Sequence, residues 1–212
     1  MEKFIYPYQF NYIRVQLSQL LQTVYFAGDY RVYAAHKLGV RDNILSMFPH
    51  LGPSESSLFD GMEDVKGQSE ISEFMDRLKP HVIPFPALAP EDVRKLFAKV
   101  KKLTLPDFVD ISWSQLSYFG WRDIATSTLF LVTHYNGKLI GIRNRITSLN
   151  RPGVCCVCNH SGQDVGLVTT AANASNYTTV GNHMCLNTVN CNAGMTSLAG
   201  LETFVEQAQR RR

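Results

Sequence analysis

The sequence predicts an α+β protein with an N-terminal helical bundle over residues 1–83 and an α/β domain over residues 84–212. Two observations predict this organisation before any motif is considered. Apolar residues recur at helical spacing through the first half of the chain, whereas β-rich runs with a hairpin signal dominate the middle of the second half. A proline-rich stretch separates the two patterns, which is typical of a domain boundary.

The first half begins with two helical patterns, over residues 9–27 and 30–47. The apolar face of the first consists of Phe10, Ile13, Leu17, Leu20, Leu21 and Val24. Gly28-Asp29 separates the two segments, and Gly39 makes a break possible within the second. Helices with short connections of this kind predict a small bundle.

A loop and a short helix complete the first half. Residues 49–68 are rich in Pro, Gly and Ser and read as a loop. Residues 69–79 place four apolar residues at positions i, i+3, i+4 and i+7, and Ser69 is a candidate N-cap. Residues 79–90 then hold four prolines and form the predicted linker.

Pro90 opens the next predicted helix, because proline is favoured at the first helical position. Its apolar face consists of Val93, Leu96, Phe97 and Val100, and its outer side of Arg94, Lys95, Lys99, Lys101 and Lys102. This basic helix over residues 94–102 is either a solvated face or a patch for an acidic partner or RNA.

Strand patterns follow. Residues 129–135 are β-rich, Asn136-Gly137 is a strong signal for a type I′ turn, and residues 139–142 return as the partner strand. Residues 163–170 and 176–184 form a weaker predicted hairpin. A last helix is predicted over residues 197–209.

Two cysteine pairs carry the chemistry of the chain. Cys155 and Cys158 form a C-x-x-C, while Cys185 and Cys191 form a C-x5-C. Four thiolates bind zinc tetrahedrally, so these four are the predicted ligands of a Zn²⁺ site within residues 153–192. A treble-clef zinc finger has a cysteine-containing turn, then a β-hairpin, then ligands near the start of a helix. The first cysteine pair, the predicted hairpin and the second cysteine pair follow in this order.

Other readings of these cysteines are weaker. Adjacent Cys155 and Cys156, an odd total and an N-terminus without an apolar signal core fit a disulfide scaffold badly. No thioredoxin-like βαβ pattern supports a redox C-x-x-C. His160 and His183 lie beside the pairs and could each replace one thiolate, although four cysteines already complete the shell. Cys156 is then a spare thiol.

A closed four-thiolate shell leaves no position for a catalytic water, so the metal is predicted to be structural and the protein is not predicted to be an enzyme. No H-E-x-x-H motif occurs, and the acidic residues give no nucleophile–base spacing. Catalytic residues are therefore predicted to be absent.

Composition fits a folded protein. Hydrophobic residues make up 45% of the 212 residues and charged residues 18%, so wholesale disorder is not expected. A net charge of +3 is too small to argue for nucleic-acid binding by itself. The sequence contains no run of eighteen apolar residues, so no membrane-spanning helix is predicted. We expect a cytoplasmic monomer with reduced cysteines.

Several segments together resemble one known family, the FusB/FusC elongation factor G-binding proteins. The resemblance lies in residues 95–103 with Pro106-Asp107, in residues 116–123, in residues 153–159, in Tyr177-Thr178, and in residues 181–185 with Cys191-Asn192. These blocks run in the family's order through residues 91–192. The C-x5-C spacing is unusual for a zinc finger in general but typical of this family.

The resemblance implies a helical N-terminal domain, a C-terminal treble-clef zinc domain, and elongation factor G as the partner. Family members help to release that factor from the ribosome, and some thereby protect against fusidic acid. The predicted partner-binding residues flank the metal: Val154, Tyr177, Val180, His183, Met184 and Phe204. Met184 and Phe204 fit a buried core equally well.

The chain departs from the family at three of these positions. It has Val154 where an aromatic residue is common, His183 where tyrosine is common, and no lysine near Val180. The alternative function is a zinc-stabilised protein that binds RNA or the ribosome without specificity for elongation factor G. The basic helix, the tail of three arginines and several aromatic residues support it, although direct nucleic-acid binding is not favoured.

Overall fold

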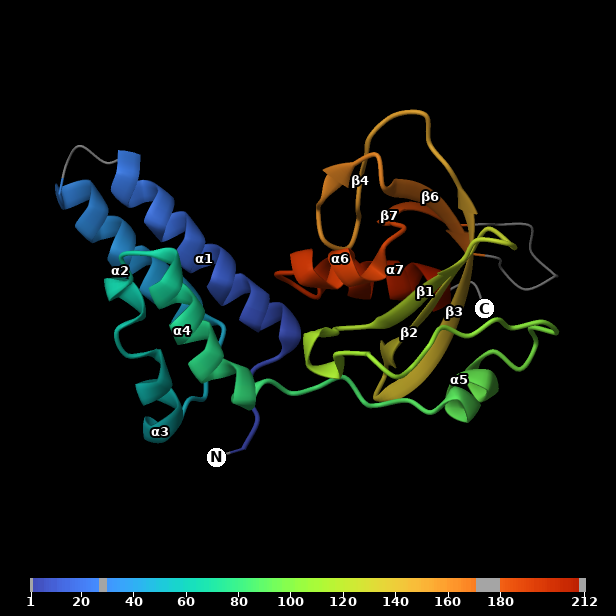
Figure 1. Ribbon diagram of the computed structural model, residues 1–212, viewed down its shortest axis with the longest axis horizontal. Helices are drawn as coiled ribbons and strands as arrows, with labels where there is room; N and C mark the ends of the chain where they lie inside the picture. The colour runs from blue at the N-terminus through green and yellow to red at the C-terminus, as the bar shows by residue number, and fades with distance from the viewer. Residues whose placement is uncertain (1, 27–29, 171–179, 210–212) are drawn as a thin grey trace. The chain divides into compact units, whose positions relative to one another are not determined.

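The computed structural model describes residues 2–26, 30–170 and 180–209, with the side chains of residues 24–33 left aside. The chain forms two compact units, Met1–Ile83 and Pro84–Arg212. The first is helical, and the second combines an antiparallel sheet with short helices (Figure 1). The predicted α+β class is therefore confirmed.

The first unit is built on three longer helices. Its elements are α1 (Pro7–Phe26), α2 (Tyr30–Ser46), α3 (Pro53–Ser56), η1 (Ser57–Phe59), η2 (Met62–Asp64), α4 (Gln68–Leu78) and η3 (Lys79–His81). Helices α2 and α4 both pack against α1. The apolar residues expected at helical spacing form the core, among them Ile13, Leu17, Leu20, Ile71 and Phe74.

Several boundaries in this unit differ from the sequence prediction. Helix α1 begins at Pro7 rather than at residue 9, and α2 continues through Gly39 without a break. The N-cap of α4 is Gly67, so Ser69 was a wrong prediction and lies within the helix. The carboxylate of Glu70 accepts a hydrogen bond from the backbone N–H of Lys66 at this end, 2.9 Å away. The predicted loop over residues 49–68 contains α3 and two short 3₁₀ helices.

The second unit begins with α5 (Pro90–Leu96), which is shorter than the sequence suggested. Phe97 is the C-cap of this helix, so Lys99, Lys101 and Lys102 lie beyond it. The predicted basic helix over residues 94–102 is therefore wrong as a helical face, although these lysines are exposed. The 3₁₀ turn η4 (Trp113–Gln115) follows before the sheet.

The sheet of this unit has five antiparallel strands in the order β1-β2-β3-β6-β7. They are β1 (Phe119–Asp123), β2 (Thr128–Tyr135), β3 (Lys138–Thr147), β6 (Val165–Thr170) and β7 (Val180–Cys185). Strands β4 (Gly153–Val154) and β5 (Ser161–Gly162) form a separate two-stranded ribbon. Helices α6 (Thr188–Gly194) and α7 (Ala199–Gln209) complete the unit.

The predicted hairpin between β2 and β3 is confirmed. Asn136 and Gly137 both have positive φ, 49° and 73°, as a type I′ turn requires. Strand β3 runs on to Thr147, well past the predicted end at residue 142. The second hairpin pairs β6 with β7, and the predicted residues 176–179 lie outside the described part of the chain.

An aromatic cluster covers one face of the sheet. The rings of Trp121 and Phe130 stack with centroids 4.9 Å apart, and Phe97 meets both edge-on. A Cβ atom at Gly141 would lie 2.8 Å from the Phe97 ring, so this strand position requires glycine. Gly120 faces the opposite side of β1, where Thr188 of α6 donates a hydrogen bond to its carbonyl oxygen. Helix α6 is therefore anchored to the face away from the aromatic cluster.

Candidate metal centre

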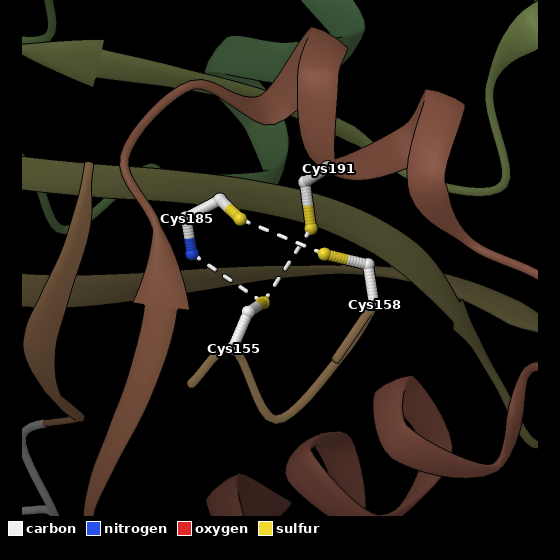
Figure 2. Close-up of side chains that lie close together, drawn as sticks. All are labelled: Cys155, Cys158, Cys185 and Cys191. Atoms are coloured by element: carbon white, nitrogen blue, oxygen red, sulfur yellow. Dashed lines mark hydrogen bonds between the residues drawn. The ribbon is translucent and has the colours of Figure 1, made fainter. Parts of the chain in front are cut away.

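Three segments of the second unit bring the four predicted ligands together (Figure 2). Cys155 and Cys158 lie in the turn after β4, Cys185 is the last residue of β7, and Cys191 lies on α6. The four sulfur atoms all lie within 4.8 Å of one another. Cys155, Cys185 and Cys191 are buried, and Cys158 is half-buried.

The sulfur separations fit one tetrahedral metal ion. Cys155 Sγ lies 3.8 Å from Cys191 Sγ, and Cys158 Sγ lies 3.6 Å from Cys185 Sγ. A Zn–S bond of about 2.3 Å in a regular tetrahedron places neighbouring sulfurs about 3.8 Å apart. Disulfide bonds are about 2.05 Å long, so these sulfurs are not paired covalently. The donor set is soft thiolate, which selects zinc over calcium or magnesium.

The turn that holds the first pair is shaped by its own backbone. The N–H of Cys155 donates to the carbonyl oxygen of His160 at 2.8 Å, and the N–H of Asn159 donates to that of Cys155 at 3.0 Å. Asn159 has φ of 60°, a left-handed conformation that asparagine tolerates better than most residues. These features fold the chain back on itself within a few residues, so both sulfurs point to one side.

The second pair depends on the start of α6. The side chain of Asn187 caps this helix by accepting hydrogen bonds from the N–H groups of Val189 at 3.0 Å and Asn190 at 3.1 Å. Cys191 lies one turn later, directed back toward the end of β7. The long C-x5-C spacing therefore spans a strand end, a cap and one helical turn.

The thiols are close enough to shift one another's pKa values. Hydrogen bonding with Cys158 lowers the pKa of Cys155, whereas hydrogen bonding with Cys155 raises that of Cys191. The four thiols therefore do not ionise independently, and the thiolate of Cys155 is favoured at the expense of the Cys191 thiol. A divalent cation is the group that allows all four sulfurs to ionise together.

The flanking residues stay outside this cluster. His160 Nε2 pairs with the Asp164 carboxylate at 2.9 Å on the surface. The cluster found among the described residues contains no histidine, so His183 contributes only its carbonyl oxygen, which accepts a hydrogen bond from the N–H of Cys156 at 2.8 Å. Burial raises the pKa of the Cys156 thiol to about 12, which leaves it a poor nucleophile at neutral pH.

The predicted partner-binding residues fall into different environments. Val154 is 56% exposed, and Val180 and His183 are half-buried. Met184 and Phe204 are 0% and 2% exposed, so both belong to the core and neither side chain offers a surface for a partner.

These residues also do not form one patch. His183 and Val180 point to opposite faces of β7, because side chains alternate along a strand. Tyr177 lies outside the described residues.

Sequence reasoning missed two residues that support the cluster. Asn192 is buried beside Cys191 and forms hydrogen bonds with the backbone of Ser117 and Tyr118. Tyr118 is fully buried, and burial together with the neighbouring Cys191 raises its pKa well above the usual value. Adjacency to a ligand was the available signal for Asn192. Tyr118 lies in the family-like block 116–123, but the sequence suggested an exposed aromatic residue on which RNA could stack, and its burial shows that this interpretation was wrong.

Comparison with known families covers most of the chain. Residues 4–86 match the N-terminal domain of the elongation factor G-binding proteins. Residues 94–209 match the FBP C-terminal treble-clef zinc-finger. The chain belongs to the family of FusB/FusC-type elongation factor G-binding proteins. The family resemblance of residues 91–192 is thereby confirmed, and so is the treble-clef class of the second unit.

A solved structure has the same fold. The structure of the fusidic acid resistance protein FusC superposes with a TM-score of 0.84, over 96% of each chain and at 24% sequence identity. No curated protein matches the chain. Within the described residues, no helix is long and apolar enough to cross a membrane.

Proposed function

We propose that this protein binds translation elongation factor G through its C-terminal unit and promotes release of the factor from the ribosome. Fusidic acid stalls the same complex, so the protein would reduce sensitivity to that drug. The family membership over residues 4–86 and 94–209 carries the proposal. The similar fold of a protein described as a fusidic acid resistance protein supports it.

The metal in this proposal is one Zn²⁺ held by Cys155, Cys158, Cys185 and Cys191. Its four ligands come from a turn, a strand end and a helix that lie far apart in the chain or on different elements and converge on one point. The free energy of metal binding becomes folding free energy for this part of the unit. We assign no catalytic step to it, because four thiolates leave no open coordination position.

The partner-binding face in this proposal lies around the cysteine turn and the adjoining strand. Strands β4 and β7 contact each other, and the hydrogen bond from Cys156 to His183 ties the turn to β7. Val154 is an apolar side chain exposed at this place, and His183 adds a half-buried ring. A metal-stiffened turn loses little conformational entropy on binding, so such exposed side chains are efficient contacts.

Release of the factor requires a difference in affinity. The protein shifts elongation factor G toward the released state only to the extent that it binds that state more tightly than the ribosome-bound, stalled state. The mechanism therefore demands contacts with a surface of the factor that changes between the two states.

Two substitutions at the proposed face, Val154→Asp and His183→Glu, and one control substitution elsewhere, Ile124→Asp, test this proposal. Val154→Asp and Ile124→Asp each place a carboxylate on an exposed apolar position, but Ile124 lies in the turn between β1 and β2. We expect Val154→Asp and His183→Glu to weaken binding to purified elongation factor G at least tenfold, and Ile124→Asp to leave it unchanged. Zinc content should stay the same in all three. Equal affinity in all three variants would place the interface elsewhere.

The alternative function predicts a different ligand. Exposed Lys99, Lys101 and Lys102, together with Arg143 and Arg145 on β3, could bind RNA instead. Affinity for RNA then falls steeply with salt, because each phosphate contact releases a counterion. A wild-type protein that binds RNA in this manner and ignores elongation factor G would replace the proposed function.

A further inference from the structure

Tyr118 has a buried hydroxyl group without a partner. Its side chain is 0% exposed, and no group of the described residues forms a hydrogen bond with its Oη. Burying a hydroxyl in this way is unfavourable unless a partner is supplied. Phenylalanine would fill the same space without that cost, so we looked for a group that the hydroxyl of Tyr118 could donate to when the metal is bound.

The surroundings of this hydroxyl point to the cysteine cluster. The Tyr118 ring lies on the side of β1 that faces α6, the helix that carries Cys191, because a Cβ atom added at Gly120 would lie 3.2 Å from Tyr118 Cε2 and 2.9 Å from Thr188 Cγ2. The backbone of Tyr118 is held beside the cluster by Asn192, the residue that follows Cys191. A phenol buried here stays protonated at neutral pH and is available as a hydrogen-bond donor.

We propose that Tyr118 is a positioning residue for the metal site, whose O–H donates a hydrogen bond to the Cys191 sulfur when the metal is bound. A neutral thiol is a weak acceptor, whereas a metal-bound thiolate is a strong one. Four thiolates also carry more negative charge than one divalent ion neutralises, so a donor at a sulfur stabilises the loaded site. This role of Tyr118 concerns the metal site alone and does not depend on binding to elongation factor G.

The opposite side of the cluster already shows the same kind of support. Cys155 Sγ accepts from the backbone N–H groups of Val157 and Cys185, each at 3.4 Å. Tyr118 would give Cys191 a comparable donor from a side chain. Groups that hydrogen-bond to metal ligands commonly change metal affinity by about 10–100-fold when removed.

The test compares Tyr118→Phe with Tyr135→Phe, which removes a hydroxyl at the end of β2. Zinc affinity is measured by competition with a chromophoric chelator, and the cobalt-loaded proteins are compared by absorption spectroscopy. We expect zinc to bind roughly 10-fold more weakly to Tyr118→Phe. Its sulfur-to-cobalt charge-transfer band should move to lower energy, because the thiolate loses a hydrogen bond. Tyr135→Phe should match the wild type in both measurements.

Two outcomes overturn the proposal. One is a Tyr118→Phe protein with wild-type zinc affinity. The other is weaker zinc binding with an unshifted cobalt band, because that combination reports altered packing rather than a lost hydrogen bond to sulfur.

If Tyr118→Phe does not fold, NMR spectroscopy of the wild-type protein tests the same hydrogen bond. When it is loaded with an NMR-active cadmium isotope, the Tyr118 hydroxyl proton should show coupling to the metal through the hydrogen bond. Absence of that coupling in a resolved hydroxyl signal overturns the proposal.

Discussion

Asn192 holds the backbone of Tyr118 at both its acceptor and its donor. The side-chain Nδ2 donates to the Tyr118 carbonyl oxygen at 3.0 Å, and Oδ1 accepts from the Tyr118 N–H at 3.3 Å. The same carboxamide also accepts from the N–H of Ser117 at 2.7 Å and donates to the carbonyl oxygen of Thr188 at 2.9 Å. Because Asn192 follows Cys191, these bonds connect the ligand-bearing helix α6 to the start of β1.

Replacing this carboxamide should weaken the whole C-terminal unit. Asn192→Ala leaves buried backbone groups of Ser117 and Tyr118 without partners, and each such group costs about 1–3 kcal/mol. We expect the free energy of unfolding of the zinc-loaded protein to fall by about 3 kcal/mol in urea titrations. Asn190→Ala on the exposed side of the same helix is the control and should change it by less than about 0.5 kcal/mol. Similar losses for both variants would contradict the role assigned to Asn192.

Metal analysis should find one zinc ion per chain in protein purified under reducing conditions. Cys158→Ser removes a proposed ligand, so we expect loss of the metal and unfolding of the cysteine-containing region. Cys156→Ser should keep both, because this thiol lies outside the cluster. The ligands must lose protons to bind, so zinc affinity should fall as the pH is lowered. Zinc-free, fully folded wild-type protein would contradict the assignment.

The fragment 84–212 should fold without residues 1–83. It contains the sheet, the aromatic cluster and all four proposed zinc ligands, and so has its own core and its own metal site. We expect a cooperative thermal transition in the zinc-loaded fragment and its loss after chelation, both followed by circular dichroism. A fragment that melts without cooperativity even with zinc would show that the boundary is misplaced.

Two glycine substitutions should act in opposite directions. A Cβ atom at Gly200 would overlap the carbonyl oxygen of Cys156 and lie 3.0 Å from that of Val157, so α7 could no longer pack against the cysteine turn. We expect Gly200→Ala to lower the free energy of unfolding by about 1–3 kcal/mol.

Gly39 is the matched control, because it lies within α2 and a Cβ atom added there would have no neighbour within 4 Å. Gly39→Ala should raise the free energy of unfolding by about 0.5–1 kcal/mol through helix propensity. A neutral Gly200→Ala would mean that the turn and α7 are not in close contact in solution.

Local patterns predicted the elements whose cause is local. The i, i+3, i+4 spacing of Ile71, Phe74 and Met75 predicted α4, and Asn136-Gly137 predicted the hairpin between β2 and β3. Strand β1 was missed, because its five residues, Phe-Gly-Trp-Arg-Asp, end in two successive charged residues and so lack a sustained alternation of apolar and polar side chains. The prediction made helix α5 too long, because the apolar pattern continues past residue 96. Helix α5 ends at Leu96, and the ring of Phe97 packs against Trp121 and Phe130 of the sheet.

The sequence by itself determined the family, the helical first half and the four cysteines that meet, because short spacings and characteristic blocks carry that information. The tertiary structure alone decided what surrounds the sulfurs and which side chains reach the surface. Asn192 and the backbone of Tyr118 are 74 residues apart in the chain, so no local pattern could pair them. Met184 and Phe204 became core and Val154 stayed exposed for the same reason: burial depends on which distant segments pack against a residue, and the residue's own identity does not reveal them.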